Sequence, residues 1–274
     1  MDDDKITDDE IDALDGVDLL ELGQKFLDNG DGQRALKCFL RAGEPDKSVF
    51  SRLMGLSIAA EIYRNGLGGV PVDAHKAIEL YKKIGGYRSD LCIAEIYANG
   101  CGEITADGYK ALKFYRQVLR YADDGTVSLE NNCCKILGDK PVNEWHYPSE
   151  EYLKALRGQA DIFRYGKGGV PVDGRKALNY YKRIVKTIFG TLDIDSLDED
   201  EKFKRILADG QNGNFAFEAL GEIETMYGYG EASVRYNFNK FKKFYNMAFY
   251  VGHGYLDDEN YRSWRRKNDE RTTD

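Results

Sequence analysis

The chain has 274 residues, of which 42% are hydrophobic, and its formal net charge is −8. No apolar run approaches the about 18 residues that a membrane-spanning helix needs, so the sequence excludes a membrane span. Residues 1–31 hold twelve acidic and two basic residues, and the rest of the chain is close to neutral. No basic stripe with interleaved aromatic residues is present, so we expect neither nucleic acid nor a membrane as a partner.

The N-terminus is acidic and polar, without the basic start and apolar stretch of a secretory signal, and this predicts a cytoplasmic protein. The cysteines are odd in number and irregularly spaced, which argues against a disulfide framework. They are Cys38, Cys92, Cys101, Cys133 and Cys134. We interpret the adjacent pair as small residues on the apolar side of a helix, in preference to a redox or metal pair.

Residues 1–17 form an acidic lead with few apolar residues, and we expect this lead to be flexible. Helical periodicity begins near Asp18. Residues 18–30 are predicted to form a helix that ends at Gly30, and residues 33–42 a second helix with its apolar residues on one face. This pair looks like a shorter-looped relative of the segments that follow.

Four later segments share one pattern that starts at an aromatic residue, namely Tyr63, Tyr97, Phe163 and Tyr227. Three residues later stand Gly66, Gly100, Gly166 and Gly230. Ten residues after the aromatic stand Asp73, Asp107, Asp173 and Asn237. Lysine follows at Lys76, Lys110, Lys176 and Lys240, and tyrosine at Tyr81, Tyr115, Tyr181 and Tyr245. A pattern repeated in register predicts a solenoid of stacked units.

Each unit is predicted to be a helix-turn-helix. The first helix ends at the glycine, because glycine adopts the left-handed conformation without steric cost. A short loop with one apolar anchor follows, and the Asp or Asn then caps the second helix. Alanine at Gly66 or Gly166 should therefore cost on the order of 1 kcal/mol or more. We expect alanine at Gly32 to matter less.

The long gaps between the second, third and fourth patterns hold two extra helical segments, at 127–137 and 197–208. These are either degenerate repeats or inserted packing helices. Residues 256–267 are predicted to form an amphipathic helix in which Tyr261 and Trp264 are apolar, followed by a charged tail. The predicted organisation is an acidic lead (1–17), a repeat array (18–252), and a capping helix with its tail (253–274).

The segment Tyr63-x-x-Gly66-x-x-Gly69-Val70-x-x-Asp73-x-x-Lys76-Ala77-x-x-x-Tyr81 and its near-duplicate at 163–181 resemble the Sel1-like repeat family, relatives of tetratricopeptide repeats. The resemblance covers about residues 18–252. It implies an all-α, right-handed α-solenoid of helix-turn-helix repeats, with about twelve helices. It also implies an adaptor or scaffold role. The secreted, disulfide-bonded members of the family carry a cysteine pattern that this chain lacks.

Catalytic and cofactor chemistry finds little support. The glycines at 66–69 follow a helix and lack the Lys-Ser/Thr ending of a phosphate-binding loop. The histidines His75, His146 and His253 are far apart, with no carboxylate or cysteine at ligand spacing. The acidic stretches at 28–32 and 193–201 lack the ligand order of a calcium-binding EF-hand loop. We therefore expect no metal, no cofactor and no enzymatic activity.

One set of charged residues recurs near the aromatic position. Glu61, Glu95 and Asp161 precede it by two residues, and Arg64 and Arg164 follow it by one. In the resembled family the first helix of each repeat lines the concave face, which would place the carboxylates along a groove. The alternative is a solvated helix face with local ion pairs to Arg64 and Arg164. Exposed carboxylates of this kind should contribute little to folding.

The sequence therefore predicts a non-catalytic scaffold or adaptor that holds a protein or peptide, including a basic segment, in the concave groove. The alternative is an inhibitor or immunity-type protein that occludes a partner enzyme or toxin. An enzyme would need a converging set of titratable groups, which the sequence does not show. A flexible peptide partner would favour the scaffold, and one tight folded partner the inhibitor.

Overall fold

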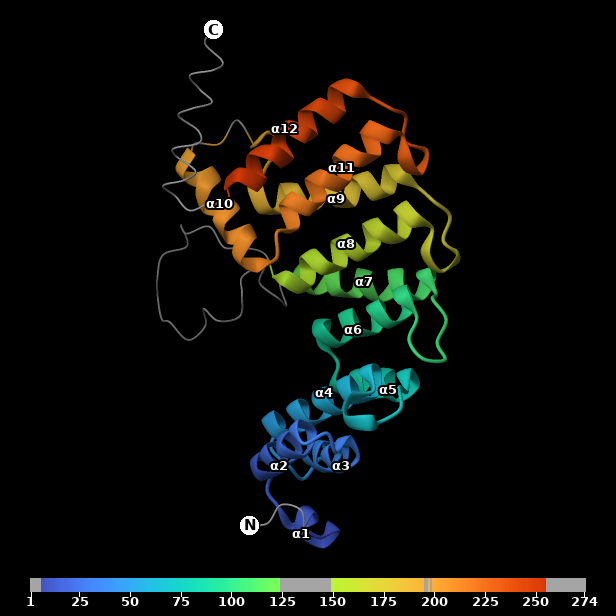
Figure 1. Ribbon diagram of the computed structural model, residues 1–274, viewed down its shortest axis with the longest axis vertical. Helices are drawn as coiled ribbons and strands as arrows, with labels where there is room; N and C mark the ends of the chain where they lie inside the picture. The colour runs from blue at the N-terminus through green and yellow to red at the C-terminus, as the bar shows by residue number, and fades with distance from the viewer. Residues whose placement is uncertain (1–5, 124–148, 195–196, 198, 255–274) are drawn as a thin grey trace. The chain divides into compact units, whose positions relative to one another are not determined.

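The computed structural model describes residues 6–123, 149–194, 197 and 199–254, and these residues form twelve α-helices and no β-strand (Figure 1). This confirms the all-α prediction. The chain divides into two compact units, Met1–Phe114 and Tyr115–Asp274, called unit 1 and unit 2 below. In each unit, helices pack in succession as pairs, which is the architecture of an α-solenoid.

Unit 1 holds α1 (Asp8–Ala13), α2 (Gly16–Asp28), α3 (Gly32–Ala42), α4 (Val49–Asn65), α5 (Ala74–Ile84) and α6 (Gly86–Asn99). From α2 to α6, each helix packs on the one that follows it. Leu19, Phe39 and Ile62 are fully buried between them. Helix α7 (Gly108–Asp123) begins in unit 1 and ends in unit 2.

Unit 2 holds α8 (Glu150–Tyr165), α9 (Gly174–Phe189), α10 (Glu199–Asn212), α11 (Phe215–Tyr229) and α12 (Phe238–Gly254). Helix α9 packs directly on α11, although α10 lies between them in the sequence. The extra segment expected at 197–208 is therefore an inserted helix, α10, which contacts α9, α11 and α12 without separating the repeat helices (Figure 1). The segment expected at 127–137 and the predicted helix at 256–267 lie outside the described residues.

Gly66, Gly166 and Gly230 have the predicted left-handed conformation, whereas Gly100 combines a positive φ with an extended ψ of 159°. All four glycines lie at positive φ, with values of 69° at Gly66, 76° at Gly100, 66° at Gly166 and 68° at Gly230. Val70 and Val170 anchor their loops and are buried. In every repeat the N–H of the capping Asp or Asn donates to the carbonyl oxygen of the aromatic residue, at 2.7–3.0 Å. This bond returns the chain to the end of the first helix, where the second helix starts.

The repeated lysine has a structural role that the sequence did not reveal. Its N–H donates to the side chain of the cap residue at 2.9–3.1 Å. Its Nζ lies 5.0–5.2 Å from the ring centre of the aromatic residue in all four repeats. Such a cation–π contact is worth about 0.5–1 kcal/mol at an exposed site. The lysine therefore ties the second helix to the first.

In two repeats the second helix begins with a glycine, and the loop of the next repeat packs against that glycine. A Cβ atom added at Gly174 would stand 2.3 Å from the carbonyl oxygen of Ala232, and one at Gly32 would stand 2.5 Å from that of Leu67. Backbone atoms of a closed loop cannot yield cheaply. The expectation that alanine matters less at Gly32 than at Gly66 considered only the local conformation of Gly32, and this contact with the following repeat argues against it.

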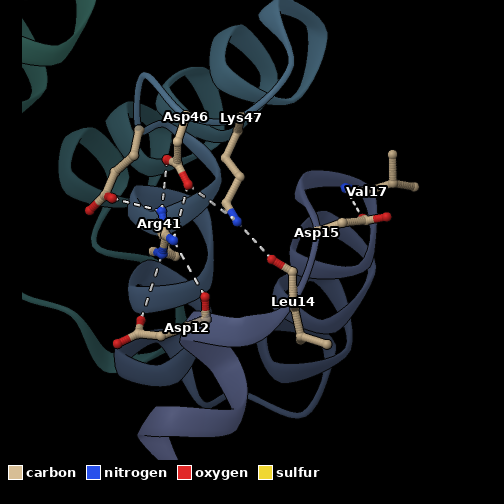
Figure 2. Close-up of polar contacts among 8 residues, drawn as sticks. Asp12, Leu14, Asp15, Val17, Arg41, Asp46 and Lys47 are labelled. Atoms are coloured by element: carbon tan, nitrogen blue, oxygen red, sulfur yellow. Dashed lines mark hydrogen bonds and ion pairs between the residues drawn. The ribbon is translucent and has the colours of Figure 1, made fainter.

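The acidic lead contains an ordered part. Residues 8–13 form α1, which starts with a capping box between Thr7 and Glu10 and buries Ile11. Arg41 of α3 donates to Glu44, to Asp46 and to the carbonyl oxygen of Asp12, and Lys47 donates to the carbonyl oxygen of Leu14 at 2.7 Å (Figure 2). The expectation of flexibility therefore does not hold for residues 8–13, which these contacts fix against α3.

The last repeat loop carries side chains at two positions where the first and third repeat loops have glycine. Ala232 and Ser233 lie at φ 52° and 65°, the conformation that Gly68 and Gly69 adopt in the first loop. Each substitution of Ala232→Gly or Ser233→Gly should relieve a strain of about 1–2 kcal/mol and lose about 0.4–1 kcal/mol through the unfolded state. We expect a net gain in unfolding free energy, measured by urea denaturation. Ala208→Gly inside α10 is the control and should lose about 1 kcal/mol; a loss at Ala232 as well would contradict the strain.

Candidate functional site

The predicted charged residues lie on the first helices of their repeats. Glu61 and Arg64 belong to α4 and Glu95 to α6, all in unit 1, whereas Asp161 and Arg164 belong to α8 in unit 2. In unit 1, Arg64 Nη2 donates to Glu95 Oε2 at 2.8 Å, and its Nη1 lies 4.0 Å from Glu61 Oε1. The structure thus brings Glu61, Arg64 and Glu95 together, and Arg64 links α4 to α6.

In unit 2 the arginine pairs across repeats and not within its own helix. Arg164 pairs with Glu222 of α11 and donates from Nη2 to Glu231 Oε2 at 2.5 Å. Burial, the largest single cause, lowers the pKa of Arg164, but the hydrogen bond to Glu231 and the interactions with Tyr165, Tyr181 and the charge of Glu231 together raise the pKa overall. The local pair expected with Asp161 does not form, because the partners of Arg164 come from the next repeat.

Glu61 and Asp161 each accept a hydrogen bond from a tyrosine at the same repeat position, a contact that was not predicted from the sequence. Tyr81 donates its hydroxyl to Glu61, and Tyr181 donates to Asp161 at 2.6 Å. Both tyrosines are almost fully buried, and burial followed by the carboxylate partner raises their pKa values. A buried hydroxyl needs a partner. These two carboxylates therefore support folding more than the expected solvated row would, and the repeated tyrosine was the available signal.

A cavity of about 480 Å³ opens beside the Tyr81–Glu61 pair in unit 1. We call it the α4–α6 cavity, since α4, the end of α5 and the start of α6 line it. Its lining is mainly apolar and includes Leu53, Ile58, Ile84 and Tyr87. The polar residues of the lining are Ser57, Glu61, Tyr81, Arg88, Ser89 and Cys92. The arrangement is an apolar hollow with one hydrogen-bonded carboxylate.

A comparison of two repeats shows which residues of the sequence leave the α4–α6 cavity open. Helix α5 ends at Ile84 because Gly85 and Gly86 follow at φ 69° and 80°, whereas α9 continues for five more residues to Phe189. Residue 57 is serine in unit 1, and the equivalent residue of unit 2 is Arg157, which pairs with Glu218 of α11. The equivalent space beside Tyr181 has no room for a water molecule.

An exposed apolar surface adjoins the α4–α6 cavity. Val49, Phe50, Leu53 and Met54 are exposed on the first half of α4, and we call this set the α4 apolar face. Their spacing places them on one side of the helix, and Leu53 also lines the cavity. Contiguous exposed apolar surface of this kind is typical of a binding site. This surface was not predicted, although the sequence of α4 places apolar residues on two sides of the helix.

The chemistry of this site favours binding over reaction. Burial, the largest cause, raises the pKa of the Cys92 thiol and so disfavours the nucleophilic thiolate. The hydroxyl of Tyr81 is already committed to Glu61. Among the residues that the structure describes, no group of three His, Cys, Asp or Glu is placed to hold a metal ion. None of the described helices combines the length and apolarity that a membrane crossing requires.

Comparison with protein families finds the Sel1 repeat at residues 16–44, 53–84, 90–117 and 155–184. The first stretch covers α2 and α3, the pair that the sequence analysis treated as a shorter relative. The chain is also similar to a solved structure of a protective antigen present in uropathogenic Escherichia coli strains displaying an SLR fold. Identity is 15% and the TM-score 0.39, over 92% of this chain and 57% of that one. No curated protein matched the sequence.

Proposed function

Because the chain belongs to the Sel1 repeat family, whose repeats are protein-interaction modules, we propose that it is a non-catalytic scaffold that binds a protein or peptide. The observation that carries the proposal is the α4–α6 cavity with the adjoining α4 apolar face. Protein interfaces concentrate their binding energy in a few side chains that fill such pockets, surrounded by apolar contacts that exclude water.

The polar side of the cavity suggests what the partner presents. Glu61 accepts from Tyr81 and from Asn65 Nδ2 at 2.8 Å. A carboxylate offers about four acceptor positions, so Glu61 retains capacity for an N–H or ammonium group of the partner. Arg64 and Glu95 neutralise each other beside it. We propose a partner segment with one large apolar side chain for the cavity and a nearby donor, such as a basic residue, for Glu61.

The expected acidic groove contributes to this proposal only in part. Glu61 remains in the proposed surface, whereas Asp161 and Arg164 are engaged with Tyr181, Glu222 and Glu231 inside unit 2. A row in which three carboxylates act together is therefore not part of the proposal. The binding surface that we propose is confined to unit 1.

A substitution that copies the closed repeat tests the proposal. Ser57→Arg introduces the residue found at the equivalent position of unit 2 and should fill the cavity. Peptides selected from a phage-displayed library on the wild-type chain should bind this variant at least about 10-fold more weakly, a loss of about 1.4 kcal/mol. Affinity is measured by fluorescence anisotropy with the selected peptides.

The matched control is His75→Arg, which adds the same charge on exposed α5 outside the cavity lining. It should leave affinity unchanged, and both variants should keep the wild-type melting temperature. Glu61→Gln should weaken only those selected peptides that carry a basic residue. Undiminished binding to the Ser57→Arg variant would show that the cavity is not the binding surface.

A further inference from the structure

Helix α6 begins at the wall of the α4–α6 cavity, and its N-cap residue is a glycine. Helices α2 to α5 each start with a side chain that accepts from N–H groups of the first turn, namely Asp15, Asp31, Ser48 and Asp73. The N-cap of α6 is Gly85, which has no side chain to accept those bonds. Gly85, Gly86 and Tyr87 line the cavity. The N-terminus of α6, with the positive end of the helix dipole, therefore borders the cavity.

The equivalent helix of unit 2 shows which group this N-terminus binds when the chain supplies one. In α11 the carboxylate of Asp209, a fully buried residue of α10, accepts from Ala216 N at 2.9 Å and from Phe217 N at 3.4 Å. Counted from the aromatic residue of each repeat, the corresponding residues of α6 are Gly86 and Tyr87. In unit 1 a single glycine separates α5 from α6, where unit 2 has the inserted helix α10. A carboxylate for α6 must therefore come from another source.

Ser89, one turn into α6, is a second and independent sign of a ligand. It lines the cavity although it is only 5% exposed, and within the described part of the chain its hydroxyl has no hydrogen-bond partner. The other three repeats have small apolar residues at this position, namely Gly55, Ala155 and Ala219. A buried hydroxyl without a partner is costly, so a ligand that completes its hydrogen bond is favoured. Arg88, also in the lining, adds a positive charge to the same turn.

We propose that this end of the cavity binds the C-terminal carboxylate of the partner, whose last side chain fills the apolar part. The first-turn N–H groups of α6 and the hydroxyl of Ser89 donate to the carboxylate, and Arg88 supplies the opposite charge. Only the terminal residue of a peptide carries a carboxylate and a side chain on one carbon atom, so both enter one hollow of about 480 Å³. The inference rests on the proposed function and specifies which part of the partner the cavity holds.

The carboxylate of Glu61 in the same lining does not oppose this binding. Glu61 accepts hydrogen bonds from Tyr81 and Asn65, and Arg64 Nη1 lies 4.0 Å from its Oε1. These contacts offset its negative charge, and the remaining acceptor capacity suits a basic residue of the partner. The expected partner end is therefore an apolar C-terminal residue preceded by a basic residue.

Acid and amide forms of the same peptides test the inference. Peptides are selected on the wild-type chain from a library displayed with free C-termini, and each is synthesised with a C-terminal carboxylate or a C-terminal amide. By fluorescence anisotropy the acids should bind at least about 10-fold more tightly, because hydrogen bonds to a charged group are the strong ones. Arg88→Glu should remove most of this difference. Its carboxylate repels the ligand but favours the start of a helix, so the melting temperature should not fall.

Ser89→Ala and a charge-matched control complete the test. Ser89→Ala should weaken the acids several-fold and leave the amides unaffected. Alanine stands at the equivalent position of α8 and α11, and the change removes a hydroxyl without a partner, so this variant should also keep its melting temperature. Lys82→Glu makes the same charge change as Arg88→Glu at an exposed residue of α5 outside the cavity lining. It should leave both affinities unchanged.

Three results would overturn the inference. The first is equal binding of acids and amides; Ser57→Arg then decides the proposed function separately, because it weakens both forms if the cavity holds the partner. The second is an acid–amide difference that persists in the Arg88→Glu variant, since the carboxylate then binds elsewhere. The third is an amidated peptide with a final glutamate that binds as tightly as the free acid, which assigns the site to a side-chain carboxylate.

Discussion

Alanine at Gly174 should destabilise the protein by about 1–3 kcal/mol, the range measured when atoms are forced into packed sites. The added Cβ would stand 2.3 Å from the carbonyl oxygen of Ala232 and 2.6 Å from Val234 Cγ2. The loop that holds these atoms is closed by hydrogen bonds from Val234 to Glu231 and from Asn237 to Tyr227. To accommodate the methyl group, α9 and the next repeat must move apart. Urea denaturation followed by circular dichroism measures the loss.

Gly32→Ala should behave in the same way in unit 1. Its Cβ would meet the carbonyl oxygens of Leu67 and Gly68 at 2.5 and 2.6 Å. Neither Gly32 nor Gly174 lies at positive φ, so backbone strain of the glycine itself plays no part. The loss of unfolding free energy therefore reports how closely the next repeat approaches the glycine.

Gly221→Ala is the matched control for these two substitutions. Gly221 lies within α11. Apart from its chain neighbours and the nearby backbone of α11 itself, no atom comes within 4 Å of a Cβ added there. Alanine exceeds glycine in helix propensity by about 1 kcal/mol, so this variant should gain stability. Opposite signs for one chemical change would establish the close approach between repeats. Equal stability of the wild-type protein and the Gly174→Ala variant would contradict that approach.

Local features of the fold were predictable because a few neighbouring residues determine them. Gly66 closes its helix and Asp73 caps the next one through contacts within thirteen residues of Tyr63. The same spacing in four segments then predicted helix pairs throughout. Lys76, whose role was not predicted, is also only thirteen residues from Tyr63, the ring that it contacts.

Features that depend on how one repeat meets the next were not predictable. Arg164 finds its partners 58 and 67 residues away, and nothing in its own segment distinguishes it from Arg64, which pairs with Glu95. Whether Glu61 faces a cavity depends on the early end of α5 at Gly85 together with the size of residue 57. The residues responsible can be read from the sequence. Their effect becomes clear only when the contacts between packed repeats are known.

The contacts of Arg164 predict that removing its two carboxylate partners lowers the unfolding free energy more than removing the arginine does. Glu222→Gln combined with Glu231→Gln should cost about 3–5 kcal/mol, because the guanidinium of Arg164 is left buried without a compensating charge. The side chain of Arg164 is only 5% exposed, and both carboxylates belong to α11 or its following loop. The side-chain amides still accept hydrogen bonds, so the loss should lie near the lower end of that range.

Removal of the arginine should be milder. Arg164→Met keeps most of the volume and removes the buried charge. Glu222 and Glu231 are 35% and 39% exposed, so water can solvate them once the arginine is gone. The triple variant should resemble Arg164→Met alone, since neutral residues at all three positions leave no buried charge. Unfolding free energies from urea denaturation provide the comparison.

Arg157 offers the control for this asymmetry, because it joins the same two helices through Glu218 but is 45% exposed. Exposed pairs contribute about 0–1 kcal/mol, so Arg157→Met and Glu218→Gln should each have small and similar effects. If Arg164→Met proves as harmful as the double glutamine variant, attraction between the charges stabilises the α8–α11 contact. If the double variant is clearly worse, the two glutamates serve chiefly to make the burial of one arginine tolerable.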